Sequence, residues 1–314
     1  MPTDKRQRQR ANAAAKAAAA HAQAKRRSNR NRAIGGGLAV VLIVGVIALL
    51  IATSTGSSKK SSSAATTTTA ATAATTPTTA PASPSTTALA PAKAPPVKGG
   101  QSLTGATPCP NATSPRVSHF AQAPPTCIDP SKTYTATFHT TEGDIVVALD
   151  TKTTPETTNN FVVLSRYAYY NGSSFDRIDQ SIDIIQGGSP NTQDITDPGP
   201  GYTIKDEPAS KFKTDASGNV TGPFNSYAPG DLVMARSSGR DSAAAQYFFV
   251  TGPKASALDA QGSYVVFGHV TTGLPILQNI EQHLYAACPP TAQNCLGGAP
   301  SKLVLIKSIT ITES

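Results

Sequence analysis

A run of twenty uncharged residues, AIGGGLAVVLIVGVIALLIA, occupies positions 33–52 near the start of the chain. A helix of this length extends about 30 Å, which matches the hydrocarbon thickness of a bilayer. The run is long for the apolar part of a cleaved signal peptide, and it lacks a clear small-x-small cleavage site. We therefore predict a single membrane-spanning helix over residues 33–52, with a cleaved signal peptide as the alternative.

The charges around this run predict its orientation. Residues 1–32 contain ten lysines and arginines and one acidic residue, Asp4, whereas the other 282 residues carry 17 basic and 18 acidic side chains. Because positive charge stays on the cytoplasmic side, residues 1–32 are expected to form a basic cytoplasmic tail, with everything after residue 52 outside. A basic tail can also bind nucleic acid. The membrane segment disfavours that interpretation, so no nucleic-acid partner is expected.

Residues 53–100 consist mainly of Ser, Thr, Ala and Pro. Such a composition buries too little apolar surface to offset the entropy that a chain loses on ordering. This segment is predicted to be a disordered linker that holds the rest of the chain away from the membrane.

All four cysteines follow the membrane segment, in a compartment where disulfides form. Four cysteines allow three pairings. We favour the local pairs Cys109–Cys127 and Cys288–Cys295, each of which would staple an irregular, Pro-rich segment. No C-x2-C pair and no histidine at ligand spacing accompanies them, so no metal is expected. Residues 101–133 are interpreted as an irregular, disulfide-bearing segment.

Residues 134–314 have the pattern of a compact β domain. The sequences YTATFH and DIVVAL alternate as a half-buried hairpin does, and further strands are expected at SSFDRI, IDIIQG, DLVMAR, QYFFVT, YVVFGHV and KLVLIKSITIT. One helix is expected to begin at Thr154 and Pro155, and another to span Pro275 to His283. Since all-β chains remove exposed edges by closure, we predict a closed antiparallel barrel of about eight strands capped by two helices.

The residues available for chemistry exclude several mechanisms. The sequence contains no G-x-S-x-G elbow, no H-E-x-x-H run and no Walker loop. The adjacent acids Asp206 and Glu207 are expected to be solvated in a turn. What remains is a set that can bind and polarise a ligand without forming a bond to it, and that needs no cofactor: Arg177, Gln186, Met234, Gln246, Phe248 and Leu258.

At this point the sequence resembles a known family, the cyclophilin-type peptidyl-prolyl cis/trans isomerases. The resemblance runs from about Tyr134 to Thr312 and includes SSFDRI, IIQGGSP, GPGYTIKDE, GDLVMAR, AQYFFVT and YVVFGHV in the family's order. Many weak motifs in one order are far more specific than any one of them. The resemblance implies an eight-stranded antiparallel barrel capped by two helices, with the substrate groove on its outer face.

Matched position by position, the resemblance assigns the site. Arg177 corresponds to the catalytic arginine of the family's F-H-R motif, and Gln246 is the glutamine of its Q-F-F motif. Proline-containing polypeptides are the implied substrates. The resemblance also implies a substrate-binding set of Gln186, Ile184, Met234, Ala235, Phe248, Leu258 and Tyr264.

The sequence departs from the family pattern near these positions. Asp176 replaces the usual histidine of F-H-R, and Ile182, Asp183 and Ile184 replace the family's pocket Phe-Met. The chain contains no tryptophan, and Ala257 stands where many members carry one. By resemblance, this predicts weak binding of cyclosporin.

Two functions follow from these observations. The first is a membrane-anchored peptidyl-prolyl isomerase that assists the folding of proteins outside the cytoplasm. The alternative is a catalytically weak module that binds proline-containing segments, which the altered residues 182–184 and Ala257 favour.

Overall fold

The computed structural model describes residues 89–111, 114–208, 213–214, 220–222, 225–289, 291 and 295–314. The predicted basic tail, the predicted membrane-spanning run at 33–52 and most of the predicted linker lie outside these residues. Within the described part of the chain, no helix is both long enough and apolar enough to cross a bilayer.

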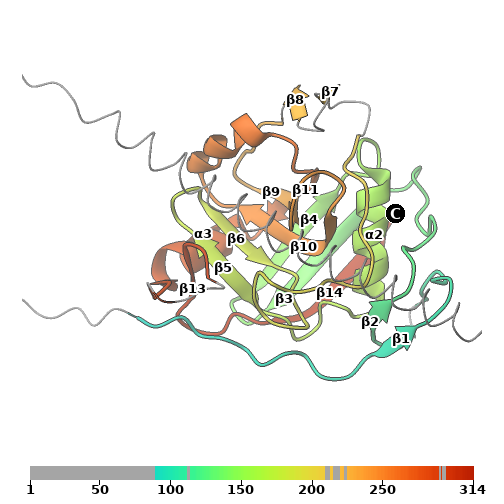
Figure 1. The fold of residues 1–314 in the computed structure, drawn as a ribbon, viewed down its shortest axis with the longest axis horizontal. Helices are drawn as coiled ribbons and strands as arrows, with labels where there is room; N and C mark the ends of the chain where they lie inside the picture. The colour runs from blue at the N-terminus through green and yellow to red at the C-terminus, as the bar shows by residue number, and fades with distance from the viewer. Residues whose placement is uncertain are drawn as a thin grey trace, which may run out of the picture. The chain divides into compact units, whose positions relative to one another are not determined.

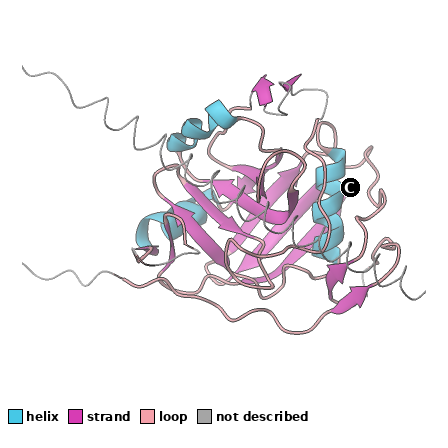
Figure 2. Cartoon of the chain, in the orientation of Figure 1, coloured by secondary structure: helices cyan, strands magenta, loops and turns pink. Residues whose placement is uncertain are grey.

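Most of the regular secondary structure in the described part of the chain is strand, as Figures 1 and 2 show. The helices are α2 (Pro155–Arg166), α3 (Leu274–His283) and the 3-10 helix η1 (Pro253–Gln261). The strands are β1 (Gln101–Leu103), β2 (Val117–Phe120), β3 (Tyr134–Thr140), β4 (Asp144–Leu149), β5 (Phe175–Asp179), β6 (Ile184–Gly187), β7 (Lys213–Thr214), β8 (Val220–Gly222), β9 (Asp231–Arg236), β10 (Ala243–Val250), β11 (Val266–Thr272), β12 (Tyr285–Ala287), β13 (Gly298–Pro300) and β14 (Ile306–Glu313).

Ten of the strands form one sheet in the order β12-β13-β5-β6-β10-β9-β11-β4-β3-β14. All of its pairings are antiparallel. The eight strands from β5 to β14 in this order are those expected from the sequence, whereas β12 and β13 were not predicted.

The strand pairing does not show the predicted closed barrel. The hydrogen-bonded ladders end at β14 and β12. Contact between the start of β14 and the residues before β5 consists of an isolated bridge between Ser174 and Leu305 and a few backbone hydrogen bonds, including Phe175 N–H to Val304 O at 3.0 Å. The physical reason is that β13 already pairs with β5 at Ile178 and occupies part of the edge that closure would use.

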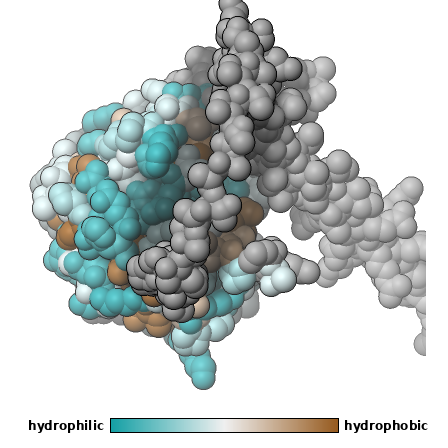
Figure 3. Space-filling view, turned by 90° about the vertical axis from the view of Figure 1, so that its left-hand side faces the viewer, coloured by the Kyte–Doolittle hydropathy of each residue, from teal (hydrophilic) through white to brown (hydrophobic). Residues whose placement is uncertain are grey.

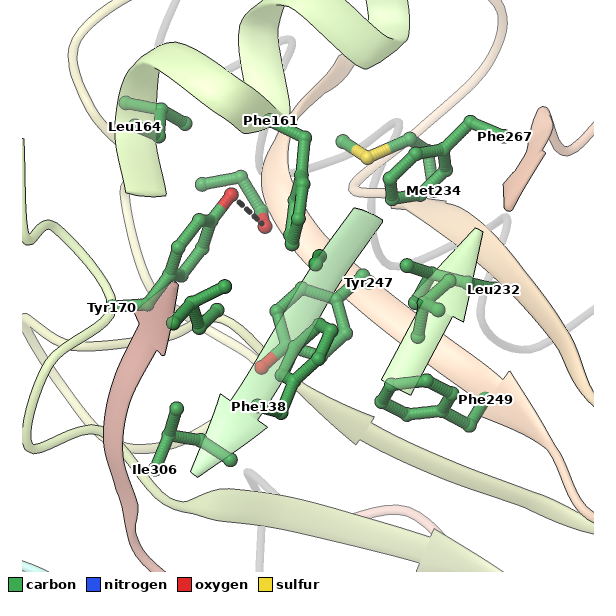
Figure 4. Packing of buried hydrophobic residues seen from close by; sticks show 14 of the residues in the cluster. Phe138, Phe161, Leu164, Tyr170, Leu232, Met234, Tyr247, Phe249, Phe267 and Ile306 are labelled. Atoms are coloured by element: carbon green, nitrogen blue, oxygen red, sulfur yellow. Dashed lines mark hydrogen bonds between the residues drawn. The ribbon is translucent and has the colours of Figure 1, made fainter. Parts of the chain in front are cut away.

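The core consists of aromatic and aliphatic side chains from one face of this sheet and from α2 (Figure 4). Phe161 of α2 lies among Phe138, Tyr247 and Phe267, with ring centroids 5.3–6.0 Å apart. Each such ring pair contributes about 0.5–1.5 kcal/mol beyond its buried area. The strand residues that point inward alternate with residues that point outward, which is what allows the outer face to carry a site.

Both predicted helices are present and pack against the sheet. Helix α2 packs on β14 and β11, and α3 packs on β6 and β12. Helix α2 begins after Thr154, as predicted, but the Thr154 side chain makes no capping bond to the helix.

The N-terminus of α2 is instead capped by Glu207, far along the chain. Its carboxylate accepts hydrogen bonds from the backbone N–H groups of Glu156 at 2.9 Å and Thr157 at 2.6 Å. Glu207 is buried, so the expectation that this acid would be solvated is wrong. The unpaired N–H groups and positive dipole at a helix N-terminus explain why a carboxylate is stable there.

Disulfides and backbone hydrogen bonds fasten the irregular segments of the described chain. Both predicted disulfides, Cys109–Cys127 and Cys288–Cys295, are present. Residues 89–100, the last part of the predicted disordered linker, run along the domain. The Val97 N–H donates to Pro190 O at 2.8 Å.

Candidate active site

Four adjacent strands place a row of side chains on one face of the sheet. The register sets Arg177 on β5 opposite Gln186 on β6, Gln186 opposite Phe248 on β10, and Phe248 opposite Val233 on β9. Residues opposite each other on paired strands project to the same face. Gln246 lies two residues before Phe248 and projects to that face as well. The row therefore joins a cation, two amides and an apolar group.

Three acceptors hold the guanidinium of Arg177. Nη1 donates to Gln186 Oε1 at 3.0 Å, Nη2 to Asp179 Oδ2 at 2.6 Å, and Nε to the backbone oxygen of Leu296 at 3.1 Å. The side chain is 16% exposed. Because a guanidinium has five N–H groups, two of them have no partner among the described residues. These two are available to a ligand.

The two glutamines continue the hydrogen-bond chain. Since Gln186 Oε1 accepts from Arg177, its Nε2 is the donor to Gln246 Oε1, at 2.8 Å. Among the described residues, the Gln246 amide nitrogen then has one contact, a long one of 3.5 Å to Ile195 O. The network therefore orients the amide nitrogen of Gln246 away from Gln186, and one of its N–H groups has no partner among these residues and can donate to a bound carbonyl.

Phe248 belongs to an apolar cluster that is separate from the main core. The ring of Tyr264 packs on Phe248 with centroids 5.9 Å apart and planes nearly perpendicular. This cluster, called the apolar platform below, contains Ile184, Tyr227, Val233, Ala235, Phe248, Val250, Ala255 and Leu258, with Ile182, Tyr264 and Val266 packed against it. It lies next to the hydrogen-bonding row. Phe248 itself is only 3% exposed, so Ile182, Tyr264 and Val266 are the partly exposed side chains through which an apolar ring can meet this cluster.

Residues 135–310, more than half of the chain, match the family described as cyclophilin type peptidyl-prolyl cis-trans isomerase/CLD. The chain belongs to this family. A peptidyl-prolyl cis-trans isomerase of Helicobacter pylori (strain ATCC 700392 / 26695) is 35% identical over 156 residues, which cover 48% of this chain and 83% of that protein. Peptidyl-prolyl cis-trans isomerase B of Escherichia coli (strain K12) is 29% identical over 183 residues, covering 56% of this chain and 99% of that protein.

A solved cyclophilin-type isomerase of Cryptosporidium parvum, crystallised in the presence of the dipeptide Ala-Pro, aligns with 57% of this chain and 99% of that chain. Its TM-score is 0.40 and its sequence identity is 25%. The family match and the relatives from Helicobacter pylori and Escherichia coli identify this chain as a cyclophilin-type peptidyl-prolyl cis-trans isomerase.

One predicted groove residue of this cyclophilin domain lies elsewhere. Met234 is fully buried in the main core, beside Phe161 and Phe267, and not in the apolar platform (Figure 4). The physical reason is the period of two along β9: if Ala235 and Val233 face outward, Met234 faces inward. Val233, which was not predicted, pairs with Phe248 and is fully buried within the apolar platform.

Arg236, at the end of β9, is a second residue that the sequence reasoning missed. Its guanidinium lies 4.7 Å above the Tyr264 ring and donates to Asp206 Oδ2 at 2.7 Å and to Ser263 Oγ at 2.9 Å. Asp206 is fully buried, which corrects the expectation of a solvated acid. Burial raises the pKa of Asp206, and Arg236 opposes that change. The Arg236 guanidinium therefore supports the Tyr264 ring, and this ring packs on Phe248.

Asp176, the acid that replaces the family's histidine, points away from solvent. Both carboxyl oxygens are buried and neither meets a donor at good hydrogen-bond geometry among the described residues. The same is true of the Ser189 and Tyr247 hydroxyl groups. The pKa of Asp176 is raised to about 7: burial is the main cause, Asp197 and Asp194 act in the same direction, and Ser189 and Arg177 act against it. Asp176 therefore does not act as an acceptor for the guanidinium, a role that Asp179 fills.

The side of the molecule that carries α3 and β13 is mainly hydrophilic, with scattered hydrophobic patches and a shaded hydrophilic hollow (Figure 3). Among the few large apolar side chains exposed in the described residues is Leu296. Its carbonyl is the acceptor for Arg177 Nε. No sequence signal marks Leu296, because a backbone oxygen carries no residue preference.

Proposed function

We propose that this chain isomerises X-Pro bonds by a non-covalent mechanism at the face formed by Arg177, Gln246 and Phe248. The observation that carries the proposal is the guanidinium with two available N–H groups, held next to an apolar platform. Arg177 on β5 and Phe248 on β10 are separated by one strand, β6, so their backbones lie about 10 Å apart. A prolyl ring bound beside Phe248, against the partly exposed Tyr264, leaves its amide within reach of the long arginine side chain.

The chemistry requires only differential binding. Rotation about an X-Pro bond crosses about 18–20 kcal/mol because twisting destroys amide resonance. In the twisted state the prolyl nitrogen regains a lone pair, which a guanidinium N–H can bind more strongly than it binds the planar amide. A rate gain of about four powers of ten requires about 5.5 kcal/mol. One directed charge in a partly dry site can supply this amount.

The roles of the remaining side chains follow from their positions. Gln246 would hold the carbonyl of the residue before proline through its amide N–H. The platform residues Ile184, Ala235, Leu258 and Tyr264 would exclude water around the ring. Gln186 is hydrogen-bonded to both Arg177 and Gln246 and so orients them. We therefore assign Gln186 to substrate positioning.

Arg177→Ala in the full chain tests this proposal, with turnover measured on a chromogenic X-Pro peptide. We expect a loss of at least about a hundredfold in kcat/KM, with an unchanged circular dichroism spectrum. Arg166→Ala is the matched control, because Arg166 lies on α2 and pairs with Glu313 at 2.8 Å. Full turnover in Arg177→Ala would refute the assignment of the catalytic residue.

The alternative is a module that binds proline-containing segments and turns over slowly. The observation that favours it is the salt bridge between Arg177 Nη2 and Asp179 at 2.6 Å, which neutralises part of the charge that catalysis would use. Binding of proline peptides without turnover in a folded parent chain would favour this alternative.

We also propose that the isomerase domain lies outside the cytoplasm and is anchored by residues 33–52. The apolar run and the basic residues before it support this, as do two disulfides, which are typical of oxidising compartments. Protease added to intact cells should remove the domain. Protection from the protease until the cells are lysed would contradict the proposed orientation.

A further inference from the structure

The disulfide between Cys288 and Cys295 lies between β12 and β13 in the chain, and β13 is a neighbour of β5, the strand that carries Arg177. Strands β12 and β13 flank the disulfide and pair with each other, and β13 pairs with β5 through Gly298. The Cys288 N–H also donates to Gly297 O at 3.2 Å. The two ends of the loop are therefore joined both covalently and by backbone hydrogen bonds.

The residue after Cys295 touches the proposed catalytic arginine. The Leu296 carbonyl accepts a hydrogen bond from Arg177 Nε at 3.1 Å and one from the Gly298 N–H at 3.0 Å. The position of a backbone carbonyl depends on the path of its loop and not on side-chain rotation. Of the three acceptors of the guanidinium, this one alone comes from outside β5 and β6.

Loss of the disulfide would release this acceptor. Without the crosslink, the segment from Cys288 to Cys295 regains conformations that closure forbids, and the bond to Arg177 Nε must compete with that entropy. With Nε unpaired, the guanidinium can tilt about its remaining bonds to Gln186 and Asp179. Since stabilisation of a transition state depends on the direction of its donors, such a tilt lowers turnover.

We propose that the Cys288–Cys295 disulfide is a positioning element of the isomerase, which holds the Leu296 carbonyl on Arg177 Nε and so directs the remaining guanidinium N–H groups at the prolyl amide. This inference rests on the proposed role of Arg177. It predicts a loss in kcat with little change in KM, because the platform around Phe248 is not altered.

The first test compares two double variants of the full chain, Cys288→Ala/Cys295→Ala and Cys109→Ala/Cys127→Ala. The second disulfide is the matched control, since it lies beside α2, where the Cys127 N–H donates to Asn159 Oδ1 at 2.7 Å. We expect a fall of about tenfold in kcat for the first variant, the loss of roughly one charge-assisted hydrogen bond. The control should stay within about twofold. Equal losses in both variants, or no loss in the first, would overturn the proposal.

A second pair of variants keeps both disulfides and disturbs the contact between the Leu296 segment and β5. A Cβ atom added at Gly297 would lie 2.8 Å from Ile178 O and 3.1 Å from Asp179 Cγ, so Gly297→Ala must move the Leu296 segment or β5 beside Arg177. Gly99→Ala is the control, because it has a similar positive φ of 79° against 76° but no atom within 4 Å of the new Cβ. We expect kcat to fall for Gly297→Ala only. Unchanged kcat in Gly297→Ala would also overturn the proposal.

A double-mutant cycle with Arg177→Lys separates positioning from general structure. Lysine has no Nε–H at the position of the arginine, so removing the Cys288–Cys295 disulfide should leave the residual turnover of Arg177→Lys unchanged. An additive loss would mean that the disulfide acts on the domain as a whole, and would overturn this inference alone. If Arg177→Ala and Arg177→Lys both keep full turnover, the proposed function of Arg177 fails, and this inference fails with it.

Discussion

Replacing Asp176 with asparagine tests the electrostatics behind the proposed catalytic strand. The carboxyl group is buried, and its pKa is raised from 3.8 to about 7, with burial as the main cause. Asp197 and Asp194 raise the pKa as well, while Ser189 and Arg177 lower it. The folded domain therefore holds a proton on Asp176 at pH values where the unfolded chain has lost it.

The sign and size of the effect follow from this difference in pKa. Below about pH 4 both states are protonated and Asp176 costs nothing. Between about pH 4 and pH 7 the unfolded chain ionises first, so the free energy of unfolding falls with rising pH, by about 4 kcal/mol in total. Above about pH 7 the cost is constant. Because asparagine does not titrate, Asp176→Asn should be more stable than the parent by up to about 4 kcal/mol at pH 8 and nearly equal at pH 4.

Urea unfolding of residues 89–314, followed by circular dichroism at several pH values, measures this difference. Asp150→Asn serves as the control of opposite sign: although burial acts to raise it, hydrogen bonds from Thr153 and the Lys152 N–H leave the pKa of Asp150 lowered. Its carboxylate stabilises the fold at neutral pH, and that stability is lost as pH falls through the lowered pKa. An equal gain for Asp176→Asn at pH 4 and pH 8 would refute the reasoning.

Three other predictions follow from single contacts. Glu207→Gln should lower the free energy of unfolding by about 1–2 kcal/mol, since a neutral amide replaces the carboxylate that caps α2; a change below about 0.5 kcal/mol in urea unfolding would contradict the capping role. Met234→Ala should destabilise the domain by about 2–5 kcal/mol and leave KM for a proline peptide unchanged, whereas a raised KM would place Met234 in the groove. Ala257 is exposed before Leu258, so Ala257→Trp should bind cyclosporin more tightly than the parent. The new residue would be the only tryptophan and its fluorescence would report binding; unchanged affinity would contradict the role assigned to this position.

Local patterns were enough for most elements of the domain. Helix α2 begins after Thr154, as predicted, and it buries Phe161 and Leu164. The eight strands from β5 to β14 in the sheet lie within a few residues of their predicted positions. The favoured disulfides also form. These features depend on the period of the hydrophobic residues and on short loop lengths, both of which can be read along the chain.

Local sequence patterns identified only part of the candidate site. The motifs singled out Arg177, Gln186, Gln246 and Phe248, and the register brings these four to one face. Alternation could show that Met234 and its neighbours face opposite ways. It could not show which of them faces the core, because that depends on which side of the sheet α2 covers.

The sequence by itself determined the order of strands and helices, the alternation within each strand and the residue types available for chemistry, because these are properties of local covalent geometry and side-chain chemistry. Only the tertiary structure decided that Glu207 caps α2, that Asp176 is buried, and that the Leu296 carbonyl meets Arg177. Each of these joins segments far apart in the chain or depends on desolvation. Such contacts exist only when the whole domain has excluded water, so no local pattern specifies them.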